Sequence, residues 1–370
     1  MRPAWAEIDL PAVADNVRTL AGLAAPARLC AVVKADGYGH GAVPVARTAI
    51  AAGASWLAVA LAEEGAALRD AGIEAPILVL SEAQPAELEL VARFGLTPTV
   101  YTAAGIDAAA KAAAAYARGG RLPVHLKVDT GMHRVGAEPS SAVGLASMIA
   151  GRHELTFAAL WTHCPVAEEP DNPFTAMQLD RFADVVAGLD AVGLRPPMLH
   201  AANSAAAIAF PASRLDMVRC GIALYGLAPA PALARSVPLR PAMRVKATVS
   251  LVKRVAAGEG ISYGLRHRFE RATNVATVPI GYADGVRRRL GAVGGEVLIR
   301  GRRRRITGVV TMDQLMVDCG DDLVDAGDEV VLIGKQGDDE IPADEWAERL
   351  GTINYEIVCG IGPRVPRRYA

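Results

Sequence analysis

Lysine is scarce in this sequence, aromatic residues are few, and the charges of the two signs nearly cancel. Arginine supplies most of the 39 basic residues, and aromatic residues make up 5% of the 370 residues. The 39 basic residues face 40 acidic ones, which leaves a net charge of -1. This balance gives no general attraction to nucleic acid or to an anionic membrane surface, so we expect small molecules or further copies of the chain as partners. The lysines are Lys34, Lys111, Lys127, Lys246, Lys253 and Lys335.

The sequence also lacks paired cysteines, metal-binding spacings and long apolar runs. Its five cysteines are spread along the chain, without a Cys-x-x-Cys pair or a metal-like spacing to histidine. Glu7 and Asp9 interrupt the stretch that a signal peptide would keep apolar. The longest uncharged stretch, 196–213, contains three prolines, whereas a membrane span needs roughly 20 continuous apolar residues. We therefore expect no metal site, no membrane segment and a cytoplasmic protein with reduced thiols.

Short runs of valine, isoleucine and leucine alternate with alanine-rich stretches in the first two thirds of the chain. This alternation is typical of strand–helix units that form a parallel sheet. Eight such units predict an α/β fold with a closed (β/α)8 TIM-type barrel, because barrels of this kind run to ~250 residues. The predicted strands are 29–33, 56–60, 77–80, 98–101, 124–128, 156–161, 198–201 and 217–220, with helices between them such as 42–52 and 139–150.

A proline-rich segment at 228–241 precedes a different pattern. The segments that follow are β-type and separated by turn residues, which predicts a mainly antiparallel β domain. Its predicted strands are 244–255, 274–280, 296–299, 306–311, 315–318 and 329–333, with one helix near 343–350. We predict a barrel domain at 1–235 and a β domain at 236–370, with the first few residues as candidates to pair with the β domain. The arginine runs 287–289 and 302–305 are interpreted as solvated turn faces, since no aromatic residues are interleaved with them.

Polar residues that follow the predicted barrel strands are the candidates for chemistry, because reactive residues lie at the carboxyl ends of barrel strands. Lys34 follows the first strand, where burial would favour the neutral amine that Schiff-base chemistry requires. A lysine that extends its amine into solvent is the alternative. Asn203-Ser204 and Gly221-Ile222 follow the seventh and eighth strands, whose loops often bind phosphate. An ordinary helix cap is the alternative for Asn203-Ser204, but a reactive lysine with a phosphate site indicates pyridoxal phosphate.

Several motifs resemble those of the alanine racemases, in the order and spacing of that family and over essentially the full chain. The motifs are VKADGYGHG at 33–41, KVDTGMHR at 127–134, WTH at 161–163, HAANS at 200–204, RCGIALYG at 219–226, ISYG at 261–264, GYADG at 281–285, MDQ at 312–314 and NYE at 354–356. One departure is Cys164-Pro165, where the family more usually has an aromatic residue and alanine. His40, His133 and His200 fall inside motifs without metal-like spacing, so we interpret them as structural.

The resemblance implies two catalytic residues with pyridoxal 5'-phosphate as cofactor. Lys34 would bind the cofactor covalently and serve one face of the substrate, and Tyr263 would be the base for the other face, supplied by the second subunit of a homodimer with shared sites. The supporting residues would be Arg219, which faces the pyridine nitrogen, His163, Arg134 and Lys127, which is carbamylated in some members. Further implied cofactor contacts are Tyr38, Asn203, Ser204, Gly221, Ile222 and Tyr355, and implied substrate contacts are Arg134, Met312, Asp313 and Tyr282.

The implied activity is the interconversion of L-alanine and D-alanine, with D-alanine supplied to peptidoglycan synthesis. Two alternatives stay open. One is a racemase of the same type that acts on another amino acid, such as serine or lysine, because a few pocket contacts set specificity. The other is a non-catalytic protein that binds pyridoxal phosphate, which is disfavoured because the C-terminal domain with Tyr263 is present.

Overall fold

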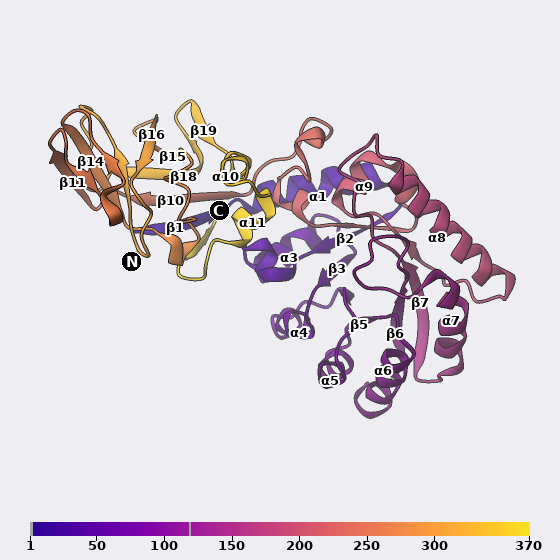
Figure 1. Ribbon diagram of the computed structural model, residues 1–370. Coiled ribbons are helices and arrows are strands. Elements are labelled where there is room, and N and C mark those ends of the chain that lie inside the picture. The colour runs from indigo at the N-terminus through magenta and orange to yellow at the C-terminus, as the bar shows by residue number, and fades with distance from the viewer. Residues whose placement is uncertain (1–2, 118–119) are drawn as a thin grey trace. The chain divides into compact units, whose positions relative to one another are not determined.

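The computed structural model describes residues 3–117 and 120–370, and these form two compact units (Figure 1). The barrel unit comprises Pro11–Gly37 and Ala42–Pro241. The β unit comprises Ala242–Ala370 together with the N-terminal segment up to Leu10 and the short segment Tyr38–Gly41. Within 3–117 and 120–370, every helix is too short or too polar to span a bilayer.

Eight parallel strands form the sheet of the barrel unit, in the order β8-β7-β6-β5-β4-β3-β2-β9. Their bounds are β2 (Arg28–Val32), β3 (Trp56–Val59), β4 (Ile77–Val79), β5 (Thr97–Val100), β6 (Leu122–Lys127), β7 (Leu155–Trp161), β8 (Leu199–His200) and β9 (Met217–Cys220). The backbone hydrogen bonds Asp216 N to Leu199 O and Arg219 N to Ala202 O, each 3.0 Å, bring the last two strands together and nearly close the barrel. The predicted barrel is confirmed.

The strands form from runs that are buried on both faces, which is the property of a parallel sheet covered by helices. The helices are α1 (Leu10–Ala24), α3 (Ala42–Ala51), α4 (Ala62–Asp70), α5 (Pro85–Arg93), α6 (Ala103–Tyr116), α7 (Ala142–Gly151), α8 (Phe174–Ala191) and α9 (Ser204–Ala209). Figure 1 shows α4, α5, α6 and α7 outside the strands that they connect. Thr102 Oγ1 accepts the Gly105 N–H at 2.9 Å and so caps α6.

The β unit has one large sheet, in the order β11-β14-β17-β16-β15-β18-β10-β1-β20, with β19 paired to β18. Its pairs are antiparallel except for β1 with β20, so the predicted mainly antiparallel domain is confirmed. The strands are β1 (Ala4–Ile8), β10 (Met243–Thr248), β11 (Leu251–Val255), β14 (Thr273–Val278), β15 (Glu296–Ile299), β16 (Arg302–Thr307), β17 (Leu315–Asp318), β18 (Glu329–Gln336), β19 (Asp339–Ile341) and β20 (Arg367–Tyr369).

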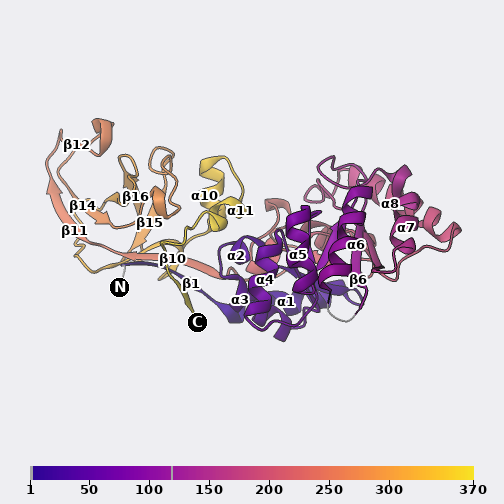
Figure 2. The ribbon, with the colours of Figure 1, turned by 90° about the horizontal axis from the view of Figure 1, so that it is seen from below.

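The remaining elements of the β unit lie around this sheet. A two-stranded hairpin of β12 (Gly260–Ile261) and β13 (His267–Arg268) lies at the same end of the unit as β11 and β14 (Figure 2). The helices α10 (Ala343–Leu350) and α11 (Asn354–Cys359) follow β19. The strand β1 pairs with β10 through Ala4–Ile8, so the N-terminal segment belongs to this sheet.

The interpretation of 302–305 as a solvated turn is wrong, because these arginines form most of β16, and the turn lies before them at Arg300-Gly301. Arg303 donates hydrogen bonds to carboxylates of Glu296 and Glu345 at 3.1 and 2.9 Å. Arg304 is 6% exposed and pairs with Asp322 at 2.9 Å. These carboxylates neutralise the arginines and allow a charged run to form a partly buried strand.

Candidate active site

The loop that follows β2 carries Lys34 in an unusual backbone conformation. Ala35 and Asp36 have φ of 51°, and Gly37 has φ of 60°, so the short element α2 (Lys34–Tyr38) contains left-handed backbone. This conformation costs about 1–2 kcal/mol for each residue other than glycine. Strained backbone persists where the surroundings fix it, and such residues cluster at functional sites. The loop therefore holds Lys34 in a defined position at the carboxyl end of β2.

Two carboxylates hold this strained loop. Glu64 Oε1 accepts the Ala35 N–H at 2.6 Å, and its other oxygen accepts the Ala60 N–H at 2.8 Å. Asp36 Oδ1 accepts the N–H of Ala42, the first residue of α3, at 2.8 Å. Glu64 thus joins the loops after β2 and β3. Charge-assisted hydrogen bonds of this kind are stronger than neutral ones, which offsets part of the backbone strain.

Arg219, on β9, is the centre of a buried cluster. Its side chain is 3% exposed, and Nη2 donates to the carbonyl oxygens of Thr162 and Ala201, each at 2.9 Å. Nη1 lies 2.8 Å from His200 Nδ1, and Nη2 lies 3.2 Å from His163 Nδ1. Among the described residues no carboxylate pairs with this guanidinium. Burial lowers the pKa of Arg219 to about 10, which leaves it protonated at neutral pH.

Trp161 contacts two basic side chains at the end of β7. The Arg219 guanidinium carbon lies 4.5 Å from the centroid of its ring, and Lys127 Nζ lies 4.4 Å from it. Lys127 ends β6 and is 3% exposed. Burial and then the charges of Arg219 and Arg134 lower the pKa of Lys127 to about 7. A lysine amine in this environment is largely neutral just above neutral pH.

His163 and the loop after β6 lie at the same end of the barrel. Burial and then the charge of Arg219 hold the pKa of His163 well below its usual value, so its imidazole is neutral. Asp129 Oδ1 accepts the N–H groups of Gly131 and Met132, both at 2.9 Å, and thereby shapes the loop that leads to Arg134. Arg134 itself is exposed at the rim of the barrel.

The side chain of Ser204 joins the loops after β8 and β9 through a hydrogen bond. Ser204 Oγ, in a side chain that is 5% exposed, accepts the Gly221 N–H at 2.8 Å. Asn203 caps α9 by accepting the Ala206 N–H at 2.9 Å, and its amide donates to the Cys164 carbonyl at 2.9 Å. The cap that was the alternative for Asn203 is therefore present, and the same side chain also fixes the loop after His163.

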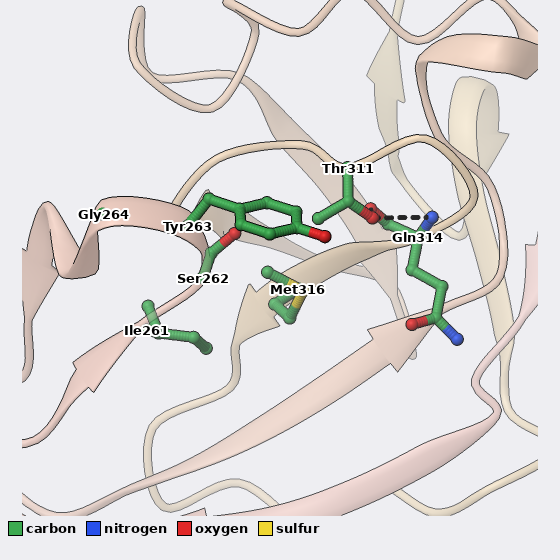
Figure 3. Close-up of a pocket in the computed structure, with 7 residues that line it drawn as sticks. All are labelled: Ile261, Ser262, Tyr263, Gly264, Thr311, Gln314 and Met316. Carbon is green, nitrogen blue, oxygen red and sulfur yellow. Dashed lines mark hydrogen bonds between the residues drawn. The ribbon is translucent and has the colours of Figure 1, made fainter.

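Tyr263 lies on an exposed loop of the β unit. Its side chain is 72% exposed and follows Ser262, which has φ of 62°. The loop borders an open pocket of about 540 Å³, in which the tyrosine ring extends towards Thr311 (Figure 3). The lining residues are Ile261, Ser262, Tyr263, Gly264, Thr311, Gln314 and Met316. Ser262 Oγ donates to the Val309 carbonyl at 2.7 Å, which holds this loop against the segment that leads to Thr311.

Tyr282, Met312 and Asp313 are brought together in the β unit. The backbone N–H of Tyr282 donates to Thr311 O at 2.9 Å, and that of Ala283 donates to Met312 O at 3.0 Å. Tyr282 and Met312 are 41% and 52% exposed. The two segments approach so closely that a Cβ on Gly281 would lie 2.3 Å from Thr311 O, which only glycine avoids.

Arg364 and Asp284 hold the same region, and sequence reasoning missed both. Arg364 Nη2 donates to Asp313 Oδ1 at 2.6 Å, and its Nε lies 3.2 Å from Asp284 Oδ1. Asp284 is fully buried and also accepts the Gly281 N–H at 3.0 Å. The GYADG motif could have indicated a structural role for Asp284, because an acidic residue that is buried in an apolar, glycine-flanked turn needs hydrogen-bonding or charged partners.

The remaining predicted cofactor contacts are divided between the units. Tyr38 and Tyr355 belong to the β unit, where their rings lie 6.2 Å apart between centroids with a tilt of 51°. Lys34, Ser204 and Ile222 belong to the barrel unit. Sequence reasoning also missed His125. Its position two residues before Lys127 could have indicated it, because alternate residues of a strand share one face.

Comparisons with known proteins agree with this arrangement. The family model of the alanine racemase N-terminal domain matches residues 8–229, and that of the alanine racemase C-terminal domain matches residues 242–369. The chain is 50% identical to an alanine racemase of Symbiobacterium thermophilum, over 100% of this chain and 97% of the relative.

Solved structures give the same result. A crystal structure of alanine racemase from Streptomyces lavendulae has a TM-score of 0.94 and 41% identity, with 100% of this chain and 97% of that chain covered. A histidine racemase from Leuconostoc mesenteroides has a TM-score of 0.90 and 30% identity, with coverage of 100% and 98%. The family models together span nearly the whole chain, and the protein belongs to the alanine racemase family.

Proposed function

We propose that this protein interconverts L-alanine and D-alanine, with pyridoxal 5'-phosphate as its cofactor. The observation that carries the proposal is the buried cluster around Arg219, which joins His163, His200 and Trp161 at the end of the barrel that also holds Lys34. The 50% identity to an alanine racemase over the full chain supports alanine as the substrate. In the cell, the D-alanine formed would supply peptidoglycan synthesis in the cytoplasm.

The chemistry of the residues at this end of the barrel fits the cofactor. Lys34 provides an amine, and Ser204 Oγ accepts the Gly221 N–H, which leaves its own proton to donate to a phosphate oxygen. Ile222 begins a short 3₁₀ turn, whose first N–H groups have no partner within the turn. When bound, pyridoxal phosphate withdraws electrons from the substrate and makes the hydrogen on Cα acidic. The further contacts that we propose are Tyr38, Asn203 and Tyr355.

Arg219 restrains the electron-withdrawing power of the cofactor ring. A guanidinium carries only donors and remains protonated, so it cannot give the ring nitrogen a proton as readily as a carboxylic acid would. An unprotonated ring nitrogen makes a weaker electron sink. We propose that this restraint favours return of the proton to Cα over side reactions.

Racemisation requires one group to remove the Cα proton and another to deliver a proton on the opposite face. We propose Lys34 for one face and Tyr263 for the other. A tyrosine acts as a base near neutral pH only with cationic or hydrogen-bonding support, and His163 and Arg219 are the proposed sources of that support. We further propose that residues 1–235 provide most of the cofactor contacts, and that residues 236–370 supply Tyr355 as a further contact together with Tyr263.

A second copy of the chain is the proposed source of the Tyr263 that completes each site. Its exposure of 72% in the single chain supports a role at a subunit interface, since large exposed aromatic side chains are typical of such surfaces. Activity would then fall on dilution below the dimer dissociation constant. Full activity in a monomer, established by analytical ultracentrifugation at the assay concentration, would contradict the shared site.

The proposed substrate contacts are Arg134, Met312, Asp313 and Tyr282. Arg134 carries the charge that would bind a substrate carboxylate, and Lys127 lies close enough to influence it electrostatically. Serine, lysine or histidine as the substrate is the alternative, and the lower identity to a histidine racemase makes alanine the better supported choice.

The scarcity of lysine makes covalent attachment of the cofactor simple to test. Borohydride reduction of the holoprotein followed by peptide mapping should place the cofactor label on Lys34, and the Lys34→Ala variant should take up none. Recovery of the label on any of the other five lysines would overturn the assignment. Exact positions can be read because each of the six lysines occurs in a different sequence context.

The second base is tested with Tyr263→Phe, which keeps the ring and removes the hydroxyl. We expect a large loss of kcat in both directions, with a substrate deuterium isotope effect that differs between L-alanine and D-alanine. The ring is retained and only the hydroxyl oxygen is lost, so the variant should keep the thermal stability of the parent. Unchanged rates in both directions would remove Tyr263 from the mechanism.

A further inference from the structure

A chain of two buried histidines extends from Arg219. His200 Nδ1 lies 2.8 Å from Arg219 Nη1, and His200 Nε2 lies 3.1 Å from His125 Nδ1. Both histidines are fully buried, on β8 and β6. Trp161 stacks on His200 with a tilt of 10°, and Trp56 packs against His125 at 5.2 Å between centroids. These contacts hold both rings in place.

The chemistry of the donors gives this chain a single direction. A guanidinium can only donate, so His200 Nδ1 must accept from Arg219. A neutral imidazole has one donor and one acceptor, so the proton of His200 is on Nε2 and is donated to His125 Nδ1. His125 in turn carries its proton on Nε2, an atom that is buried and has no hydrogen-bond partner among the described residues.

Electrostatics keep both rings neutral. Burial and then the charge of Arg219 hold the pKa of His200 well below its usual value and lower that of His125 to about 3. A protonated His200 would also direct an N–H at the N–H of Arg219. Each ring therefore has one stable state, and the acceptor for one guanidinium proton is fixed.

We propose that His125 is a positioning residue for Arg219, because its Nδ1 fixes the tautomer of His200 and so commits one guanidinium N–H to His200. Without that acceptor, the His200 Nε2–H would be buried without a partner. The other tautomer of His200 would then compete, and it would place a donor against Arg219. The kinetic consequence rests on the proposed function, whereas the direction of the hydrogen bonds does not.

Two nearly isosteric variants separate this role from simple packing. His125→Asn keeps an acceptor near the position of Nδ1, and His125→Leu removes it. In the pyridoxal-phosphate-loaded protein we expect His125→Leu to lower kcat for alanine roughly tenfold, the effect of one lost buried hydrogen bond, with little change in KM. His125→Asn should recover most of this loss. The absorption band of the cofactor should shift in His125→Leu, because Arg219 would no longer hold its orientation.

The tautomers are measured directly by ¹⁵N NMR of the holoprotein labelled at histidine, with the His200 signals identified from His200→Asn. We expect His200 protonated only at Nε2 from pH 6 to pH 9 in the parent and in His125→Asn, and a mixture of tautomers in His125→Leu. Protonation of His200 at Nδ1 in the parent would overturn the proposal. Equal kcat and equal tautomers in the two variants would also overturn it.

The kinetic measurement and the ¹⁵N measurement test the proposal independently. If His125→Leu does not fold, the tautomer of His200 in the parent and in His125→Asn still tests the direction of the chain. If the parent racemises no amino acid, the proposed function fails, but the ¹⁵N spectra continue to test the role of His125 on their own.

Discussion

The pKa of Lys127 is the most specific electrostatic prediction of the structure. The side chain is 3% exposed, and burial followed by the charges of Arg219 and Arg134 lowers its pKa from 10.5 to about 7. A shift of this size corresponds to roughly 5 kcal/mol in favour of the neutral amine, at 1.36 kcal/mol per pKa unit. At pH 8.5 about 3% of Lys127 would be charged, whereas a solvated lysine would be almost fully charged.

The six lysines make the measurement practical, because protein labelled with ¹³C at the lysine Cε gives few signals. In buffer freed of carbon dioxide, the signal that is absent in Lys127→Met should titrate with a midpoint near pH 7. Lys246 is an internal control. Burial lowers the pKa of Lys246, but the hydrogen bonds that its ammonium donates to Glu7 and Glu329 raise it by more, so its signal should titrate above 10.5.

Charge variants test the causes of the shift. Arg134→Met removes a positive charge and should raise the midpoint of Lys127, and Asp129→Asn removes a negative charge and should lower it. Both changes should be smaller than the total shift, because burial is the largest cause. A Lys127 midpoint near 10.5 in the parent would show that the amine is solvated and that burial does not lower its pKa.

Three further predictions concern stability and binding. The lowered pKa of Lys127 means that the unfolded chain binds its proton more tightly, so the parent loses stability as the pH falls from 10.5 to about 7. As the pH falls through that window, the Tm of Lys127→Met should rise relative to the Tm of the parent, and the difference should level off below it. A Tm difference that stays constant with pH would contradict this prediction. Gly281→Ala should cost about 1–3 kcal/mol because its Cβ would meet Thr311 O, and an unchanged Tm would show that the turn can move. Glu64→Ala should weaken binding of pyridoxal phosphate roughly tenfold or more by releasing the Ala35 N–H, and equal affinity in equilibrium dialysis would exclude this role.

The sequence predicted the barrel strands to within about two residues because each is a short buried apolar run. It failed at β16 (Arg302–Thr307), where the pattern is charged and the neutralising carboxylates come from distant segments such as Glu345. It also read 244–255 as one strand, whereas β10 ends at Thr248 and β11 begins at Leu251. Whether a segment forms a buried strand depends on its partners from distant parts of the chain, and the local pattern of apolar residues does not reveal those partners.

The residues of the proposed site were found through their motifs, but the contacts among them were not. His125 and His200 lie 75 residues apart and meet only because β6 and β8 both flank β7. The left-handed backbone after Lys34 likewise depends on Glu64, which follows a different strand. Sequence reasoning therefore identified chemical types, while the fold determined which of them share a hydrogen bond.

Whether this chain racemises alanine is best decided by a chirality-resolved assay. The purified protein, loaded with pyridoxal phosphate, is incubated in D₂O with L-alanine, D-alanine, serine, lysine and histidine, and each product is analysed for configuration and for deuterium at Cα. We expect alanine to be converted in both directions with deuterium in the inverted product, and faster than the other amino acids. Faster conversion of another amino acid, or no inversion of any of them, would contradict it.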